Sequence, residues 1–311
     1  MENLTNSLKV LTYNAWGLKI GPFSIAKDYK ARIYALPSEI YKLNPDIIFL
    51  QEVWKKVDRD YLIKELKKRG FSYAFYKSDG HPKIKKWRKN FSWLNRLMLG
   101  NGLLIISKHP INMKSSKVVS FSGHTAKEEF FTRKGAIFCE IEHKGLGPIS
   151  CVNTHLGSVD YFSKKLKFNP TQKNVQNSQL KELEEFVKKI PNSSPLFIGA
   201  DLNIDDRTNP LNWFSNPGAE YTELVKKLNL VDSYRLIHPS GPGITYSNNT
   251  KYKSDQHGPD ARIDYLFHAN LGSRLYPTGS DLVFNKPINQ NNKSFYLSDH
   301  FGVMSQYQLK K

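Results

Sequence analysis

The sequence predicts an α+β fold in which two sheets pack face to face and helices cover their outer faces. Short apolar runs typical of buried strands recur along the chain, two of them are joined by a glycine-containing turn, and segments with helical spacing lie between the strands. This pattern favours a layered arrangement, because each sheet can then bury both of its faces. The motifs described below run from residue 11 to residue 300 without a repeat, so we expect a single domain over residues 1–311.

Three segments have the apolar spacing of amphipathic helices. In the first, over residues 33–43, apolar side chains recur every three or four positions. In the second, over residues 179–190, a similar stripe lies between Ser178, which can cap the start, and Pro191, which closes the end. The third spans residues 220–228. We expect these helices to alternate with the strands and to cover the sheets.

The strand-like runs are short and apolar. Three of them span residues 9–13, 47–50 and 149–152. The segment 135–152 is typical of a hairpin with its turn at residues 144–147, where two glycines stand. We expect the active site to lie where such strand ends meet at one edge of the sandwich.

The composition supports a folded core. Hydrophobic residues make up 39% of the chain and aromatic residues 13%, which argues against disorder. The two cysteines, Cys139 and Cys151, lie in neighbouring strand-like runs and could face each other across the hairpin. We expect two buried free thiols, because disulfide-stabilised secreted scaffolds carry many more cysteines.

The chain is strongly basic, with 46 Lys and Arg against 28 Asp and Glu and a net charge of +18. Such a surface attracts polyanions or anionic membranes. A general excess of lysine in the proteins of the source organism would give the same net charge, so charge alone does not identify the substrate. No cleaved signal peptide and no segment of about 20 apolar residues is visible. We therefore expect a protein that is cytoplasmic, or exported without a signal peptide, and that contacts membranes from the surface.

Three long loops are expected to rim the site, at residues 77–96, 157–175 and 247–260. The first contains a stretch from Lys83 to Trp93 in which basic residues are interleaved with tryptophan and phenylalanine and no acidic residue occurs. This mixture suits contact with a membrane interface or stacking on nucleic-acid bases. It equally suits a solvated loop held to the core by its aromatic side chains.

Polar side chains follow five of the apolar runs. They are Asn14, Glu52, His155, the segment Asp201-Leu202-Asn203 and the pair Asp299-His300. This set is rich in oxygen ligands and contains two imidazoles but no thiolate. Hard oxygen ligands suit Mg²⁺, Mn²⁺ or Ca²⁺, whereas zinc and copper sites favour Cys and several His. The set therefore indicates metal-assisted hydrolysis.

The ordered motifs resemble those of the endonuclease/exonuclease/phosphatase superfamily. They are Leu11-Thr12-Tyr13-Asn14, Leu50-Gln51-Glu52-Val53, Asn153-Thr154-His155-Leu156, Gly199-Ala200-Asp201-Leu202-Asn203, Arg262-Ile263-Asp264-Tyr265 and Ser298-Asp299-His300. The resemblance implies a DNase I-like, four-layer α/β/β/α sandwich with two mostly antiparallel sheets. It also implies phosphodiesterase or phosphatase activity that depends on Mg²⁺, with Mn²⁺ as a substitute. Within the superfamily, Asn14-Ala15-Trp16-Gly17, Glu52-Val53-Trp54 and Arg133-Lys134-Gly135 are most similar to neutral sphingomyelinases.

The resemblance implies a metal site among these residues. Glu52 would be the principal ligand, because a carboxylate that follows a buried strand is costly unless a cation or another partner satisfies it. A salt bridge to a lysine is the ordinary alternative for such a residue. Asn14 would supply a neutral oxygen near the same ion, and Asp299 would be a ligand or would support one.

The catalytic residues are implied by the same motifs. His300 would be the general base, since an imidazole with a pKa of about 6.5 takes a proton from water at neutral pH, and Asp264 would hold its other nitrogen. Asp201 would orient the attacking water or a second ion. Asn203 and His155 would donate hydrogen bonds to the phosphoryl oxygens as negative charge develops there.

Two further positions concern the substrate phosphate. Lys134 matches a basic position that lies near the phosphate in the sphingomyelinase pattern, although an ordinary solvated lysine explains it almost as well in so basic a chain. The same pattern tends to have an arginine where this chain has Gln176, which leaves a role for that position open.

The predicted function is hydrolysis of sphingomyelin to ceramide and phosphocholine by an Mg²⁺-dependent monomer at a membrane surface, with water attacking phosphorus. A nuclease on the same scaffold, with nucleic acid as its partner, is the leading alternative, and a phosphoinositide phosphatase is a third. The non-enzymatic alternative is a basic module that binds membrane or nucleic acid. The joint presence of Glu52, Asp201, Asn203, Asp264 and His300 argues against it.

Overall fold

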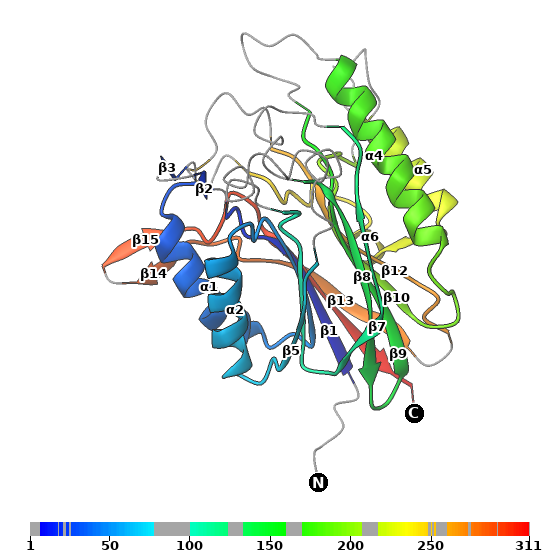
Figure 1. Cartoon of the computed structure of the whole chain (residues 1–311), viewed down its shortest axis with the longest axis horizontal. Coiled ribbons are helices and arrows are strands. Elements are labelled where there is room, and N and C mark those ends of the chain that lie inside the picture. Colours follow the sequence, from blue (N-terminus) through cyan, green and yellow to red (C-terminus); the bar gives the residue numbers. More distant parts are fainter. Residues whose placement is uncertain are drawn as a thin grey trace, which may run out of the picture.

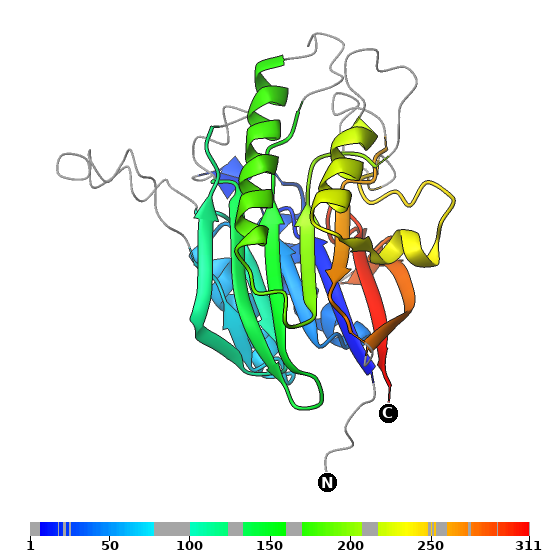
Figure 2. The same ribbon diagram turned by 90° about the vertical axis from the view of Figure 1, so that its right-hand side faces the viewer.

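A computed structural model places two six-stranded sheets face to face at the centre of the molecule (Figure 1). The residues that it describes are 7–17, 19–20, 23–24, 26–77, 100–123, 133–159, 170–206, 217–247, 250, 252, 260–272, 275–290 and 292–310. The helices are α1 (Tyr29–Leu43), α2 (Lys56–Lys67), α4 (Pro170–Lys188), α5 (Pro217–Lys227) and α6 (Ser233–Ile237). Helices α1 and α2 cover the outer side of one sheet and α4 and α5 cover the other (Figures 1 and 2). The α+β class and the four-layer sandwich predicted from the sequence are confirmed.

The first sheet has the strand order β13-β16-β1-β4-β6-β5. Its strands are β1 (Ser7–Asn14), β4 (Ile47–Gln51), β5 (Tyr73–Phe75), β6 (Leu104–Ser107), β13 (Leu275–Val283) and β16 (Gly302–Leu309). Neighbouring strands are antiparallel except for the parallel pair β1 and β4. Two short hairpins lie outside the main sheets, formed by β2 (Lys19–Ile20) with β3 (Phe23–Ser24) and by β14 (Ile288–Gln290) with β15 (Lys293–Phe295).

The second sheet repeats this plan with the strand order β11-β12-β10-β9-β8-β7. Its strands are β7 (Ile111–Ser120), β8 (Gly135–His143), β9 (Gly147–His155), β10 (Leu196–Asp201), β11 (Val231–Asp232) and β12 (Asp264–Ala269). The pair β9 and β10 is parallel and its neighbours are antiparallel. The carboxyl ends of β1 and β4, and of β9 and β10, therefore lie side by side within their sheets.

The register of the paired strands places several proposed site residues directly opposite one another or at neighbouring strand ends. Asp201 at the end of β10 pairs with His155 at the end of β9 and with Asp264 at the start of β12. In the first sheet, Asn14 at the end of β1 pairs with Gln51 at the end of β4. Because β16 runs antiparallel to β1, the residues that precede β16 lie at the same end.

The core between the sheets requires a glycine at one central position. Phe49 of β4 and Phe197 of β10 are fully buried in the cluster between the two sheets. A Cβ atom at Gly199 of β10 would lie 2.4 Å from the Phe49 ring, far inside van der Waals contact. Gly199 therefore lets the two sheets approach closely, two residues before Asp201.

Helix α4 begins at Pro170, nine residues before the start at residue 179 expected from the sequence. Ser178 accordingly lies inside the helix, so the expectation that it caps the helix start is wrong. The first turns bury Lys173, Gln176 and Gln179, which are polar. Apolar periodicity does not reveal a helical segment whose buried face is polar, so the first turns of α4 were missed. The apolar stripe that begins at residue 179 does lie in the helix, which ends at Lys188.

The predicted hairpin is confirmed, with β8 and β9 joined by a turn at residues 144–146. Cys139 lies opposite Cys151 in the register of this hairpin, and both are buried free thiols, as expected. In the part of the chain that the structure describes, no helix is both long and apolar enough to cross a membrane. The basic and aromatic stretch Lys83 to Trp93 lies outside the described residues.

Candidate active site

The polar residues predicted for the site all lie at one edge of the sandwich, where strands of both sheets begin or end. In chain order they are Asn14, Glu52, Lys134, His155, Asp201, Asn203, Asp264, Asp299 and His300. Most of them are buried, which is unusual for so many titratable side chains and gives each contact among them a large electrostatic weight.

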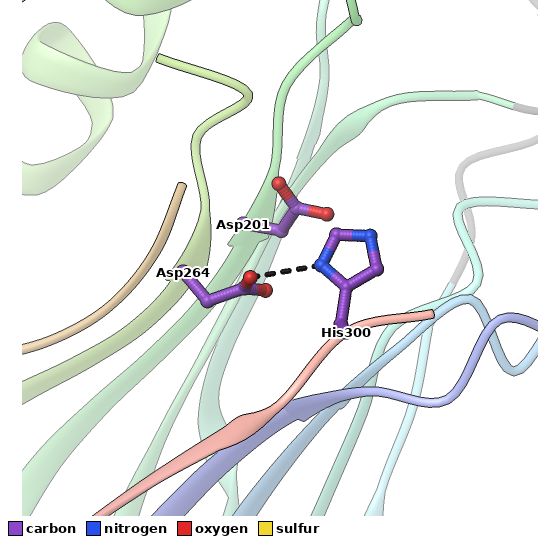
Figure 3. Close-up of side chains that lie close together, drawn as sticks. All are labelled: Asp201, Asp264 and His300. Atoms are coloured by element: carbon purple, nitrogen blue, oxygen red, sulfur yellow. Dashed lines mark hydrogen bonds and ion pairs between the residues drawn. The ribbon is translucent and has the colours of Figure 1, made fainter. Parts of the chain in front are cut away.

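His300 and Asp264 form a buried pair at the centre of this edge. The Nδ1 atom of His300 lies 2.8 Å from Oδ2 of Asp264 (Figure 3). The backbone amides of Ile263 and Asp264 donate to Oγ1 of Thr245 at 3.0 Å, and the ring of Tyr246 lies 4.9 Å from the His300 ring. Because Nδ1 is held by the carboxylate, Nε2 of the imidazole remains for proton transfer.

Asp201 completes a cluster with this pair (Figure 3). One ligand atom from each of Asp201, Asp264 and His300 lies within 4.8 Å of the others. Among the described residues, the second carboxylate oxygen of Asp264, Oδ1, is buried and has no hydrogen-bond donor. A buried carboxylate oxygen without a donor is costly unless water or a cation satisfies it. A cation beside this cluster would satisfy that oxygen and offset the two carboxylate charges.

Glu52 faces the same region from β4 of the other sheet. Its carboxylate receives two long hydrogen bonds, from Nδ2 of Asn14 at 3.3 Å and from Nε1 of Trp54 at 3.4 Å. Within the described ranges, no Lys or Arg forms an ion pair with Glu52, so the ordinary alternative of a lysine salt bridge is not found there. The carboxylate thus retains acceptor capacity, as a cation ligand requires.

The backbone of Glu52 adopts a conformation that is rare for this residue type. Its φ angle is 59°, in the left-handed region, which is costly for a side chain with a long stem. The Gly17 amide donates to the Glu52 carbonyl at 3.1 Å, and a Cβ atom at position 17 would lie 2.3 Å from that oxygen. The loop after β1 therefore needs glycine at this position to hold the turn that aims Glu52.

Asn14 bridges the acids of the two sheets. Its Oδ1 accepts the Trp16 amide at 2.8 Å, which sets the orientation of the side-chain amide. The Nδ2 group consequently donates to Oδ2 of Asp201 at 2.7 Å and to Glu52. In this arrangement the nitrogen, rather than the oxygen expected from the sequence, faces the carboxylates.

Asp299 lies next to His300 on the segment that precedes β16. Its Oδ1 accepts a hydrogen bond from Oγ of Ser298 at 3.1 Å and lies 3.9 Å from Nε2 of His300. Burial raises the pKa of Asp299, and the negative charge of Glu52 raises it further, against the lowering effect of His300. The repulsion between these two carboxylates is what a divalent cation would relieve.

Lys134, His155 and Asn203 form a hydrogen-bonded group beside Asp201, with Nε2 of His155 3.2 Å from Oδ2 of Asp201. The Lys134 ammonium lies 2.7 Å from Nε2 of His155, and Nδ2 of Asn203 lies 3.3 Å from the same nitrogen. Asn203 also donates to the Leu156 carbonyl at 2.9 Å. Lys134 is largely buried here, so it is not the solvated lysine that was the alternative reading.

Asp201, His155 and His300 have strongly perturbed pKa values. Burial and the neighbouring Asp264 raise the pKa of Asp201 to about 7. Burial alone would lower the pKa of His300, but the charges of Asp264, Asp299 and Asp201 outweigh it and raise the value to about 10. Burial and the Lys134 charge lower the pKa of His155, which keeps this imidazole neutral. Two imidazoles in one site are thus driven in opposite directions, as expected for groups with different roles.

Several supporting residues were not predicted from the sequence. Arg262 is fully buried and makes a bidentate pair with Asp232 at 2.8 Å and a bond to Asp206 at 2.9 Å, which anchors the segment that carries Asp264. In α4, Nε2 of Gln176 donates to the carbonyls of Gly157 and Asn203. Gln176 thus holds the two segments that follow His155 and Asp201, which gives a structural role to a position left open above.

Comparison with known proteins agrees with this geometry. The Endonuclease/Exonuclease/phosphatase family matches residues 11–300. A sphingomyelinase C from Bacillus cereus is 26% identical over 271 residues, covering 85% of this chain and 74% of the relative. Among solved structures, a beta toxin variant from Staphylococcus aureus with bound magnesium ions has a TM-score of 0.67 at 20% identity and covers 96% of this chain and 99% of its own. D. rerio TDP2 in complex with a single-stranded DNA product has a TM-score of 0.65 at 18% identity, with coverage of 97% and 99%.

The family match covers nearly the whole chain and includes every residue proposed for the site. The two solved structures share the fold, and the buried cluster of acids and imidazoles lies where strands of both sheets end. The activity class implied by the family is that of a phosphoric diester hydrolase. The chain belongs to the endonuclease/exonuclease/phosphatase family.

Proposed function

We propose that the protein is an Mg²⁺-dependent phosphodiesterase that hydrolyses sphingomyelin to ceramide and phosphocholine. The observation that carries the proposal is the pairing of His300 with Asp264 inside a buried cluster of acids that faces the hydrogen-bonded group of Lys134, His155 and Asn203. This arrangement offers a proton acceptor on one side of a phosphodiester and hydrogen-bond donors on the other. The similarity to a sphingomyelinase C over most of the chain supports the choice of substrate.

The donors bind and polarise the phosphate. Lys134 brings a positive charge, and Asn203 brings an amide group. The neutral imidazole of His155 accepts from Lys134 and Asn203 at Nε2, which holds both donors in place without adding a like charge beside Lys134. Because these groups are preorganised in a site with little water, they stabilise the charge that develops on the phosphoryl oxygens in the transition state.

Glu52 and Asp299 would hold the divalent cation, with Asn14 beside them. The oxygen-rich donors, the unmet Oδ1 of Asp264 and the weakly satisfied carboxylate of Glu52 fit Mg²⁺ or Mn²⁺ better than zinc. When bound, such an ion polarises the phosphoryl group and offsets its negative charge.

His300 takes the proton of the attacking water at Nε2, while Asp264 fixes the tautomer through Nδ1. The surrounding carboxylates raise the pKa of His300 to about 10, so the imidazole carries a proton at neutral pH in the protein without a cation. The general-base role therefore requires that part of this negative charge be neutralised. Neutralisation of the charge on Asp299, which would hold the cation, therefore favours proton transfer to His300.

A single set of assays tests the proposal. Purified protein is offered sphingomyelin, phosphatidylcholine, plasmid DNA and a phosphoinositide side by side, with Mg²⁺ and with EDTA, and the products are identified. We expect ceramide and phosphocholine from sphingomyelin, loss of turnover in EDTA and recovery with Mg²⁺ or Mn²⁺. Glu52→Gln serves as the control for the site. Full activity in EDTA, or turnover of DNA alone, would contradict the proposal.

A nuclease is the second candidate, because D. rerio TDP2, which shares the fold, is described in complex with single-stranded DNA product. The net charge of +18 suits a nucleic acid as well as an anionic membrane. The assay above separates the two by the substrate that is consumed. Contact with a membrane surface belongs to the sphingomyelinase proposal, and the stretch Lys83 to Trp93 is the segment proposed for it.

A further inference from the structure

Arg32, in the first turn of α1, is one of the most deeply buried charged residues, with 1% of its surface exposed. Its guanidinium donates to four backbone carbonyls. The acceptors are Lys27 at 2.8 Å, Trp16 at 2.9 Å, and Ala15 and Leu297 at 3.0 Å. The Trp16 ring lies over the same guanidinium, 4.7 Å from its central carbon.

Three of these four carbonyls belong to the two segments that carry proposed cation ligands. Ala15 and Trp16 directly follow Asn14. Leu297 lies two residues before Asp299. A single side chain therefore ties the loop after β1 to the segment before β16, and the same loop supports the turn at Glu52 through the Gly17 amide.

The chemistry of the contact requires arginine. A planar guanidinium offers five N–H donors in a fixed fork, whereas an ammonium offers three donors at one point and cannot reach carbonyls on different segments. Among the described residues, no carboxylate forms an ion pair with Arg32. The positive charge of Arg32 therefore interacts electrostatically with nearby groups, which include Glu52 and Asp299.

We infer that Arg32 is a positioning residue for the divalent cation site. It sets the distance between the loop after Asn14, which supports Glu52, and the segment that carries Asp299. The inference rests on the proposed cation site and extends it to a residue that contacts neither the ion nor the substrate. Loss of the fork would leave each ligand residue next to its strand but allow the two segments to move apart. Cation affinity should fall before the fold does.

The test measures Mn²⁺ binding to the metal-free protein by electron paramagnetic resonance, with wild type, Arg32→Lys, Arg32→Gln and Ile40→Ala. Ile40 is fully buried on the same helix and makes none of the hydrogen bonds of the guanidinium, so Ile40→Ala reports the effect of losing a buried apolar side chain from α1. Unfolding by heat and the Mg²⁺ dependence of turnover are recorded for each protein.

We expect Arg32→Lys and Arg32→Gln to weaken Mn²⁺ binding at least tenfold and to raise the Mg²⁺ concentration for half-maximal turnover in proportion. Ile40→Ala should bind Mn²⁺ within twofold of wild type despite a lower melting temperature. Equal Mn²⁺ affinity in wild type and the Arg32 variants would overturn this inference but would leave the proposed function intact. Variants that remain unfolded at 10 °C would also overturn it, because Arg32 would then serve the fold. A wild-type protein that binds no Mn²⁺ would instead contradict the proposed function.

Discussion

The contact between Asp264 and His300 allows a double-mutant test of the proposed general base. Asp264→Asn keeps an acceptor for Nδ1 of His300 but removes the negative charge. His300→Ala removes the base itself. If Asp264 acts through His300, its substitution should matter only while the imidazole is present.

The magnitudes follow from the geometry of the pair. A hydrogen bond of 2.8 Å between an imidazole and an ionised carboxylate contributes about 1.5–3 kcal/mol, whereas its neutral counterpart contributes about 0.5–1.5 kcal/mol. Asp264→Asn should therefore cost about 1–2 kcal/mol in the transition state, or about 5- to 30-fold in kcat. Loss of the base in His300→Ala should lower kcat by about 10²–10⁴.

The assay compares kcat for wild type, both single variants and the double variant at saturating Mg²⁺. The double variant should turn over at the rate of His300→Ala. Multiplication of the two single effects would refute the argument that Asp264 works through His300. A second readout is stability, since His300→Ala leaves the Asp264 charge buried without its partner and should lower the unfolding free energy by about 3–5 kcal/mol. Asp264→Asn on that background should restore part of the loss.

Three further predictions concern the cation, the core and the basic stretch. EDTA should lower the melting temperature of wild type but not of Glu52→Gln, because binding to the folded state alone adds stability; an equal shift in both would show that the effect does not come from this site. Gly199→Ala should cost about 1–3 kcal/mol in urea unfolding, because its Cβ would overlap the Phe49 ring, whereas Gly279→Ala, which meets nothing within 4 Å, should be nearly neutral. Equal effects at the two glycines would contradict the packing account. Replacing Trp87 and Trp93 by Ala should reduce liposome binding and activity on vesicles but spare a short soluble phosphodiester. Unchanged behaviour on vesicles and on DNA would show that the stretch is a solvated surface.

Much of the fold was predictable because its buried strands are apolar and its site residues follow them. The run before Glu52 and the run before Asp201 both proved to be central strands of a sheet. Pairing of parallel strands then places their carboxyl ends together, which brings Asp201 beside His155. The apolar runs and the polar residues that follow them are visible in the sequence, whereas the four-layer arrangement was implied by the family resemblance and the pairing of the strands comes from the structure.

Other features depended on contacts between distant segments. The start of α4 was missed because Gln176 and Gln179 bury polar groups that bond to the chain near Gly157. The orientation of the Asn14 amide depends on the Trp16 backbone, and the raised pKa of His300 depends on acids from several strand ends. In the sequence, the one sign of the network in which Arg262 pairs with Asp232 and Asp206 was the arginine itself, in the motif that contains Asp264.

In the proposed reaction, water attacks the phosphorus atom of sphingomyelin. Hydrolysis of sphingomyelin in H₂¹⁸O, with mass spectrometry of both products, tests it directly, and His300→Ala serves as the control. We expect the label to enter phosphocholine, ceramide to stay unlabelled, and the variant to form both products at a rate lower by about 10²–10⁴. Label in ceramide, or undiminished formation of labelled phosphocholine by His300→Ala, would contradict it.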